Sequence, residues 1–207
     1  MKKTIITLIA ITVLFVACNQ AEKKNNEKDH AVMNHGDSKS KNVMMQAMDR
    51  SMMAMHKAKL TGNADYDFAS MMIPHHEGAI DMAETFLKQS NSATLTNFAK
   101  EAIVTQKKEI KMLTEFLITA NKKPIKDAEK FKKAMDNSMM PMMDGMGKVK
   151  LTNNIDSDFV MLMIPHHQSA VDMARAYLPY SGNAQLKSIA EQILKGQEEE
   201  IKWLKKQ

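Results

Sequence analysis

The sequence predicts an all-α protein: a four-helix bundle made from two duplicated helical hairpins, with an additional Met-rich helix preceding each hairpin. Three observations predict this fold. The second half of the chain repeats the first, the apolar residues of each copy recur at the helical period, and no segment alternates as a strand would. Each hairpin has an apolar stripe that cannot stay in water, and two hairpins can bury their stripes against each other.

The internal repeat is gap-free over most of the chain. Met72-Ile73-Pro74-His75-His76 recurs as Met163-Ile164-Pro165-His166-His167, an offset of 91 residues from His75 to His166. The same offset pairs many residues on both sides of the motif. It predicts a tandem duplication, with copies at 43–120 and 127–207 that pack together as one compact domain over 43–207.

Each copy divides into three helical stretches. In the first copy, residues 43–60 carry methionines on one helical face. Asp65 or Asp67 is expected to cap a second helix that runs to about residue 89. A third helix follows Asn91-Ser92 and runs to about Thr119, before a linker that contains Pro124.

The N-terminus has the features of an export signal. Lys2 and Lys3 precede an apolar run that stops at Cys18, and Leu14 to Cys18 resembles a bacterial lipobox, in which the cysteine is acylated. We therefore expect residues 1–18 to be a lipoprotein signal and the polar residues 19–42 to be a disordered tether. The expected location is the bacterial cell envelope, lipid-anchored to the membrane and facing the periplasm or the cell surface; a plain secretory signal is the alternative.

The composition is unusual in its sulfur-containing residues. The chain has 21 Met but one Cys, which excludes an internal disulfide and a cysteine-based zinc site. It has 29 Lys and Arg, two of them in the signal segment, against 24 Asp and Glu, and only 5% aromatic residues. Without a basic block beside stacking aromatics, nucleic-acid binding is not expected.

The Pro-His-His motif is the most informative feature of each copy. Pro74 lies within a helical pattern, where proline typically costs about 3 kcal/mol, and the duplicate keeps it as Pro165. A kink or π-bulge there would aim His75 and His76 at a shared point. The alternative is that the proline opens a helix at its first turn.

The residues around the motif suit a soft metal ion. At 100° per residue, Met72 and Met82 lie on the same side of the helix as the histidine pair. Imidazole and thioether together favour Cu(I) or Ag(I) over iron, manganese or magnesium. The predicted metal ligands are His75, His76, His166, His167, Met72, Met82, Met163 and Met173.

Further methionines exceed what one buried face can use, and some must be exposed. The clusters suggest a secondary set of residues that captures the metal before the histidine sites hold it. That set comprises Met44, Met48, Met52, Met55, His56, Met135, Met139, Met143 and Met146, with His30, Met33 and His35 in the tether.

The pattern Asp-x-Asp-Phe-x-x-x-Met-Ile-Pro-His-His-x-x-Ala-x-Asp-Met-Ala starts at Asp65 and again at Asp156, and Gln-x-x-Glu-Ile follows in each copy. It resembles the domain of unknown function 305 family over about residues 43–207. The resemblance implies a ferritin-like bundle, an exported location and copper binding that contributes to copper tolerance or homeostasis. It points to the same eight metal ligands.

We thus expect a non-enzymatic protein that sequesters copper, with Cu(I) favoured, and any copper-handling protein partner is unknown. Two alternatives stay open. A ferritin-like di-iron oxidase needs Glu-x-x-His motifs, which neither copy has, and its nearest carboxylate candidates are Glu77 and Glu109. A structural or partner-binding bundle would use the methionines as core and leave the histidines hydrogen-bonded inside.

Overall fold

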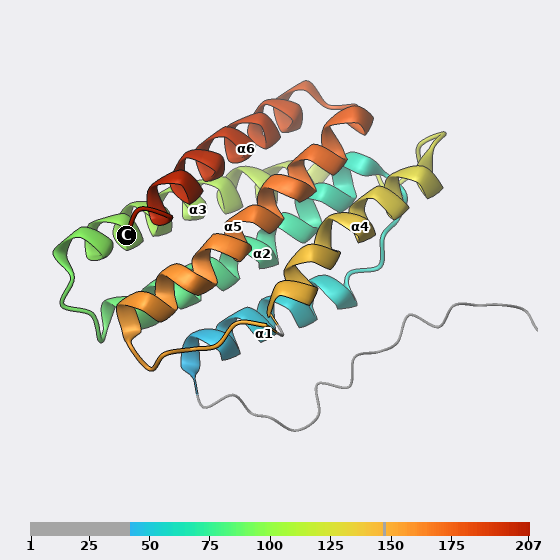
Figure 1. Ribbon diagram of the computed structural model, residues 1–207. Coiled ribbons are helices and arrows are strands. Elements are labelled where there is room, and N and C mark those ends of the chain that lie inside the picture. The colour runs from blue at the N-terminus through green and yellow to red at the C-terminus, as the bar shows by residue number, and fades with distance from the viewer. Residues whose placement is uncertain (1–41, 147) are drawn as a thin grey trace, which may run out of the picture. The chain divides into compact units, whose positions relative to one another are not determined.

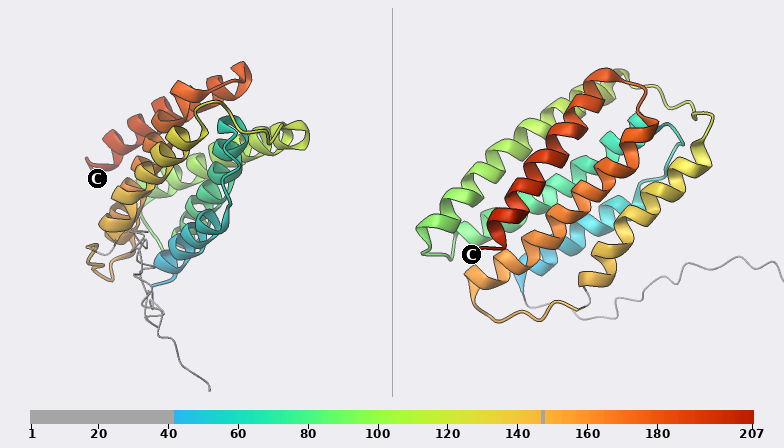
Figure 2. Two further views of the ribbon diagram at one scale, coloured as in Figure 1. Left: turned by 90° about the vertical axis from the view of Figure 1, so that its right-hand side faces the viewer. Right: turned by 45° about the horizontal axis from the view of Figure 1, so that its top comes forward.

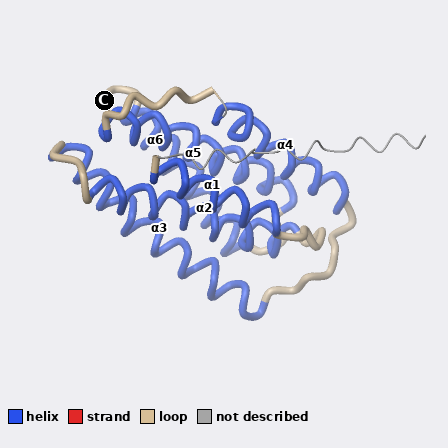
Figure 3. Tube along the Cα trace, turned by 90° about the horizontal axis from the view of Figure 1, so that it is seen from below, coloured by secondary structure: helices blue, strands red, loops and turns tan. Residues whose placement is uncertain are grey.

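The computed structural model describes residues 42–146 and 148–207, and every regular element in these residues is a helix (Figure 3). Cys18, His30, Met33 and His35, with the signal segment and nearly all of the predicted tether, lie outside the described residues. The elements are α1 (Val43–Lys57), α2 (Ala64–Leu87), α3 (Ala93–Thr119), α4 (Ala128–Met146), α5 (Ile155–Tyr177), the 3-10 helix η1 (Leu178–Tyr180) and α6 (Ala184–Leu204).

The helices form two layers of three. Within the first layer α1 packs on α2 and α2 on α3, and within the second α4 packs on α5 and α5 on α6. The layers meet mainly where α2 packs on α5, so Figures 1 and 2 show α2 and α5 between the α3–α6 pair and the α1–α4 pair. The prediction of an all-α bundle built from two hairpins, each preceded by a Met-rich helix, is confirmed.

The two central helices run antiparallel about an approximate two-fold axis. Phe68 near the start of α2 stacks on Tyr177 at the end of α5, with ring centroids 4.3 Å apart. The equivalent pair, Phe86 and Phe159, stacks at 4.1 Å at the other end. Phe159 is the repeat counterpart of Phe68, and Tyr177 is the repeat counterpart of Phe86, so the two stacked pairs are equivalent. A duplicated hairpin gives this contact pattern when its two copies pair with each other.

The start of α2 differs from the sequence prediction. Asn63, and not Asp65 or Asp67, is the N-cap, because its side chain accepts a hydrogen bond from the backbone N–H of Tyr66. Both aspartates lie in the first turn and have tertiary partners. Asp65 accepts hydrogen bonds from the Tyr177 hydroxyl at 2.6 Å and from the Gly182 N–H at 3.0 Å.

Asp67 holds the turn that connects α1 to α2. Its carboxylate accepts hydrogen bonds from the N–H and hydroxyl of Thr61 and from the N–H of Gly62. Gly62 has φ of +87°, and its repeat counterpart Asn153 has φ of 63°. Glycine and asparagine tolerate this left-handed conformation best, so both copies keep the same turn with different residues.

The interior of the molecule is rich in sulfur. Met44, Met48, Met71, Met72 and Met82 are all at most 1% exposed, and they pack with the phenylalanines into one core. Because methionine is flexible, it fills the irregular space between six helices. Among the described residues, no helix combines the length and apolar character needed to cross a membrane.

Candidate metal centre

Both motif prolines lie inside helices and not at their starts. α2 is α-helical without a break from Ala64 to Leu87, which contradicts the alternative in which Pro74 opens a helix; Pro165 is likewise inside α5. The described backbone has no π-turn at either proline. The Pro74 carbonyl accepts a hydrogen bond from the Ser51 hydroxyl of α1 at 2.8 Å, so α1 is fastened to α2 at the motif.

His75 meets its own repeat counterpart at the centre of the molecule. The imidazoles of His75 and His166 have centroids 3.9 Å apart at an angle of 44°. Both rings are fully buried. A residue can touch its counterpart only on or near the two-fold axis, so this pair marks the place where the two copies of the motif converge.

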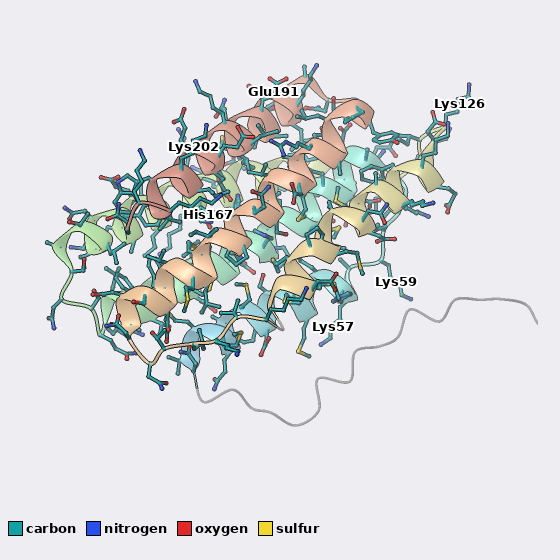
Figure 4. The ribbon with its side chains drawn as sticks, viewed as in Figure 1. Lys57, Lys59, Lys126, His167, Glu191 and Lys202 are labelled. Carbon is teal, nitrogen blue, oxygen red and sulfur yellow. The ribbon has the colours of Figure 1, made fainter. Side chains whose placement is uncertain are left out.

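The second histidine of each motif points toward a carboxylate of the outer helix. Nε2 of His76 in α2 lies 2.9 Å from Oε2 of Glu109 in α3. Nε2 of His167 in α5 lies 3.0 Å from Oε2 of Glu200 in α6. The ring N–H does not point directly at the oxygen in either pair, so these are close contacts and not aligned hydrogen bonds. Figure 4 labels His167 among the helices, whereas Lys57, Lys59, Lys126 and Lys202 are exposed.

The four histidines lack hydrogen-bond partners to an unusual degree. None of their eight ring nitrogens has an aligned partner among the described residues, although all four side chains are 0% exposed. Leaving a buried polar group unsatisfied typically costs about 1–3 kcal/mol. Such a cost at four adjacent side chains makes these nitrogens candidates for binding a ligand.

Further polar groups surround the histidines. Oε1 of Gln106 and of Gln197 and the hydroxyl of Ser169 are also buried without a partner among the described residues. Gly78 admits α1 to the site, because a Cβ atom there would lie 2.5 Å from the Ser51 Cβ and 3.5 Å from Nε2 of His166. Ser51 therefore lies beside the histidine centre.

The four methionines predicted to ligate the metal are fully buried. Met72 and Met82 are in α2, and Met163 and Met173 are in the equivalent places of α5. They line the same central pair of helices as the histidines. Each copy therefore contributes two buried methionines and two buried histidines to the central helix pair.

The predicted secondary set divides into core and surface residues. Met44, Met48 and Met135 are fully buried, and Met146 is the last residue of α4. The other members of the set that the structure describes come together between α1 and α4 around a small space that we call the Met hollow. It is lined by Met52, Met55, His56, Met139, Met142 and Met143, of which Met142 was not among the predicted residues.

The site residues that the sequence prediction missed are Glu200, Gln106 and Gln197, while Glu109 was considered only as a candidate iron ligand. The signal was available: Gln106-x-x-Glu109 recurs as Gln197-x-x-Glu200 on otherwise apolar helix faces. Glu77, the other carboxylate considered, is exposed and faces away from the centre. Among the described residues, no three His, Cys, Asp or Glu side chains converge to hold a metal, so any complete ligand set there must include other donors.

Burial controls the protonation of the central pair. It lowers the pKa of His75 well below the usual 6.5, and the nearby His166 lowers it further. Burial likewise lowers the pKa of His166, with a second contribution from His167. Both imidazoles are therefore neutral at pH 7, which is the form that binds a metal.

The same pKa shifts predict a loss of stability in acid. Because the unfolded chain takes up protons near pH 6.5 and the folded chain does not, the free energy of unfolding of the metal-free protein should decrease as the pH falls below about 6.5. The decrease should level off only below the folded pKa values. Urea unfolding at a series of pH values measures it. The variant with His75 and His166 changed to Leu keeps every carboxylate, and it should show a flatter profile; an equal slope would contradict the assignment.

Comparison with known proteins places the chain in a family. The family described as "Domain of unknown function (DUF305)" matches residues 11–117 and 65–207. The chain belongs to the DUF305 family. The two overlapping matches reflect its two tandem copies of the motif. A search of curated proteins finds no match.

Solved structures of CopM resemble this DUF305 protein. The chain is 31% identical to CopM in an Ag-bound form obtained by soaking, with a TM-score of 0.52, and the alignment covers 69% of this chain and 92% of that one. The Cu(II)-bound form gives 32% identity, a TM-score of 0.52, and 69% and 94% coverage. The Cu(I)-bound form gives 30%, 0.51, and 69% and 93%.

Proposed function

We propose that this DUF305 protein binds copper, with Cu(I) favoured and Ag(I) as an alternative, at the histidine centre between α2 and α5. The single observation that carries the proposal is the set of four fully buried histidines without aligned hydrogen-bond partners. The similarity to CopM, whose structures include Ag-, Cu(I)- and Cu(II)-bound forms, supports the choice of metal.

The donor atoms fit a soft monovalent ion. Neutral imidazole and thioether bind Cu(I) and Ag(I), whereas iron and magnesium prefer carboxylate oxygens. A monovalent ion also carries the smallest charge into an interior where charge is costly. Among the described residues, the carboxylates of Glu109 and Glu200 contact the histidines, at Nε2 of His76 and His167.

Those two contacts support Nδ1 as the nitrogen of His76 and of His167 that would face the metal. A ligating histidine usually directs its other ring nitrogen to a carboxylate, which fixes the ring and raises its basicity. Glu109 would therefore hold Nε2 of His76 and leave Nδ1 for the metal, and Glu200 would do the same for His167. The two carboxylates, Glu109 beside His76 and Glu200 beside His167, together balance the charge of up to two monovalent ions.

The protein acts by stoichiometric sequestration, without catalytic turnover, and contributes in this way to copper tolerance or homeostasis. Acylation of Cys18 would hold the domain at the membrane of a bacterial cell envelope, with residues 19–42 as the tether. This part of the proposal rests on the sequence. A di-iron oxidase is not favoured, because neither copy has the Glu-x-x-His motif that such a site requires.

The test is an anaerobic competition titration of the purified protein with Cu(I) and a coloured Cu(I) chelator. We expect removal of copper from the chelator by the wild-type protein and its near-complete loss when all four histidines are changed to Leu. Met71→Leu is the matched control, because Met71 is equally buried on α2 but is outside the proposed ligand set. Unchanged affinity in the four-histidine variant, at unchanged helicity, would overturn the proposal.

A further inference from the structure

The Met hollow is separate from the histidine centre. It lies between the C-terminal parts of α1 and α4, the outer helices of the two layers. Met52 and Met143 are repeat counterparts and both line it. The hollow thus forms where the two copies of the methionine stripe meet, as the histidine centre forms where the two Pro-His-His motifs meet.

The size of the hollow limits what it can hold. Its volume is about 10 Å³, roughly the space for one water-sized particle. An organic ligand does not fit in it, but a single ion does. Methionine is the side chain best able to close irregular gaps, so a gap that remains among five methionines is not explained by their role as core filler.

The lining chemistry points to a soft monovalent ion. Five thioethers and one imidazole line the hollow, with no carboxylate, hydroxyl or ammonium group among them. Thioether sulfur is uncharged and soft, so it binds Cu(I) and Ag(I) and discriminates against hard ions such as Mg²⁺ and Ca²⁺. A divalent ion would enter without any compensating negative charge.

The hollow is open to solvent, unlike the histidine centre. His56 is exposed and Met139 and Met143 are half-buried, whereas Met52 and Met55 are only 7% and 3% exposed. Met53 and Met140, each next in sequence to a residue that lines the hollow, are 57% and 44% exposed, which is unusual for large apolar side chains. Thioether groups therefore extend from the surface into the hollow.

The hollow also borders the segment that covers the histidine centre. Ser51 precedes Met52 directly, donates its hydroxyl hydrogen bond to the Pro74 carbonyl, and lies against Gly78 close to His166. In α1, Met52 thus lines the hollow, and Ser51, the residue before it, packs over the histidines. The repeat counterpart of Ser51 in α4 is Met142, which lines the hollow.

We propose that the Met hollow is a second binding site for Cu(I) or Ag(I), weaker and more rapidly exchanging than the histidine centre. The ion is held by the thioethers of α1 and α4, with the exposed His56 at the opening. This inference goes beyond the proposed function of the histidine centre, since the two sites share no ligand. Either can therefore fail without the other.

The experiment is a titration of the purified protein with Ag(I), followed by ¹³C NMR of labelled methionine ε-methyl groups. Three proteins are compared: the wild type, the hollow variant with Met52, Met139 and Met143 changed to Leu, and a matched control with Met44, Met48 and Met135 changed to Leu. Both triple variants alter three methionines of α1 and α4, but the control residues do not line the hollow. Leucine preserves volume, so the expected cost in stability is small.

We expect the hollow variant to lose a second, weaker Ag(I) binding step that the wild type and the control variant keep. Methyl signals of Met55 and Met142 should shift in that step in the wild type but not in the hollow variant. The step should also persist when all four buried histidines are changed to Leu. Equal Ag(I) stoichiometry in the three proteins, or equal losses in both triple variants, would overturn the proposal. If the triple hollow variant loses helicity, Met143→Leu alone provides the same comparison.

Discussion

Changing His75 and His166 to Leu is expected to stabilise the metal-free protein while it abolishes the tight Cu(I) site. The two imidazoles are fully buried in contact with each other, and their four ring nitrogens lack aligned partners among the described residues. Removing unsatisfied buried polar groups relieves about 1–3 kcal/mol each, and repacking around a side chain of different shape costs up to about 1.5 kcal/mol. We expect a net gain of about 1–3 kcal/mol, which raises the melting temperature by roughly 2–4 °C for each kcal/mol.

Copper should reverse the order of stability of the two proteins, so that the wild-type protein becomes the more stable one. A ligand that binds only the folded state adds about 4 kcal/mol when its free concentration is 1,000 times Kd. The wild-type protein should therefore melt above the double variant with Cu(I) and below it without Cu(I), as measured by calorimetry under anaerobic conditions. His56→Leu is the control, because His56 is exposed and its loss should not change the metal-free melting temperature. A double variant that is less stable than the wild type without metal would show that the fold itself depends on the histidines.

The helices and the histidine pairs could be predicted from sequence because both are local signals. The methionine stripe of residues 43–60 repeats at the helical period and forms α1, which ends at Lys57. The duplication then gives the second copy at the same offset, so a single periodic pattern predicts six helices. The Pro-His-His motif stands out in the same way, because both copies keep a proline that a helix interior disfavours.

The details that the sequence could not supply are set by tertiary contacts. Asn63, Asp65 and Asp67 are all acceptable N-caps by residue type, and distant partners decide among them. Asp65 contacts Tyr177 of the other copy and Asp67 holds the preceding turn, which leaves Asn63 as the cap.

The contact between His75 and His166 likewise could not be predicted from the sequence, because it depends on the position of the two-fold axis. Periodicity places both histidines of each motif on the inner side of a helix but does not distinguish between them. The structure separates them: the first histidine meets its counterpart, and the second meets a glutamate from the outer helix of its own copy. The contact between each Gln-x-x-Glu segment and its motif is formed within one hairpin, whereas the contact between His75 and His166 depends on the axis between the two copies.

Glu109→Gln and Glu200→Gln are expected to weaken Cu(I) binding by about 10–100-fold each, which is typical when the partner of a ligating histidine is altered. Each carboxylate lies within 3.0 Å of the Nε2 atom of a buried histidine. The carboxylate orients the ring and increases the electron density at Nδ1, and the neutral amide does so less. Because the two copies are equivalent, the two single variants should show similar losses. A difference would mean that the ion is held mainly by one copy.

The measurement is the same anaerobic competition titration, with Glu84→Gln as the control. Glu84 is also in an ion pair, with Lys107 at 3.2 Å, but both partners are exposed, so its loss should leave Cu(I) affinity unchanged. Glu→Gln substitutions preserve side-chain volume, so circular dichroism should show unchanged helicity in all three variants. Full affinity in Glu109→Gln and Glu200→Gln would mean that the carboxylates do not orient the ligands. The orientation of the rings would then be fixed by packing against α3 and α6 alone.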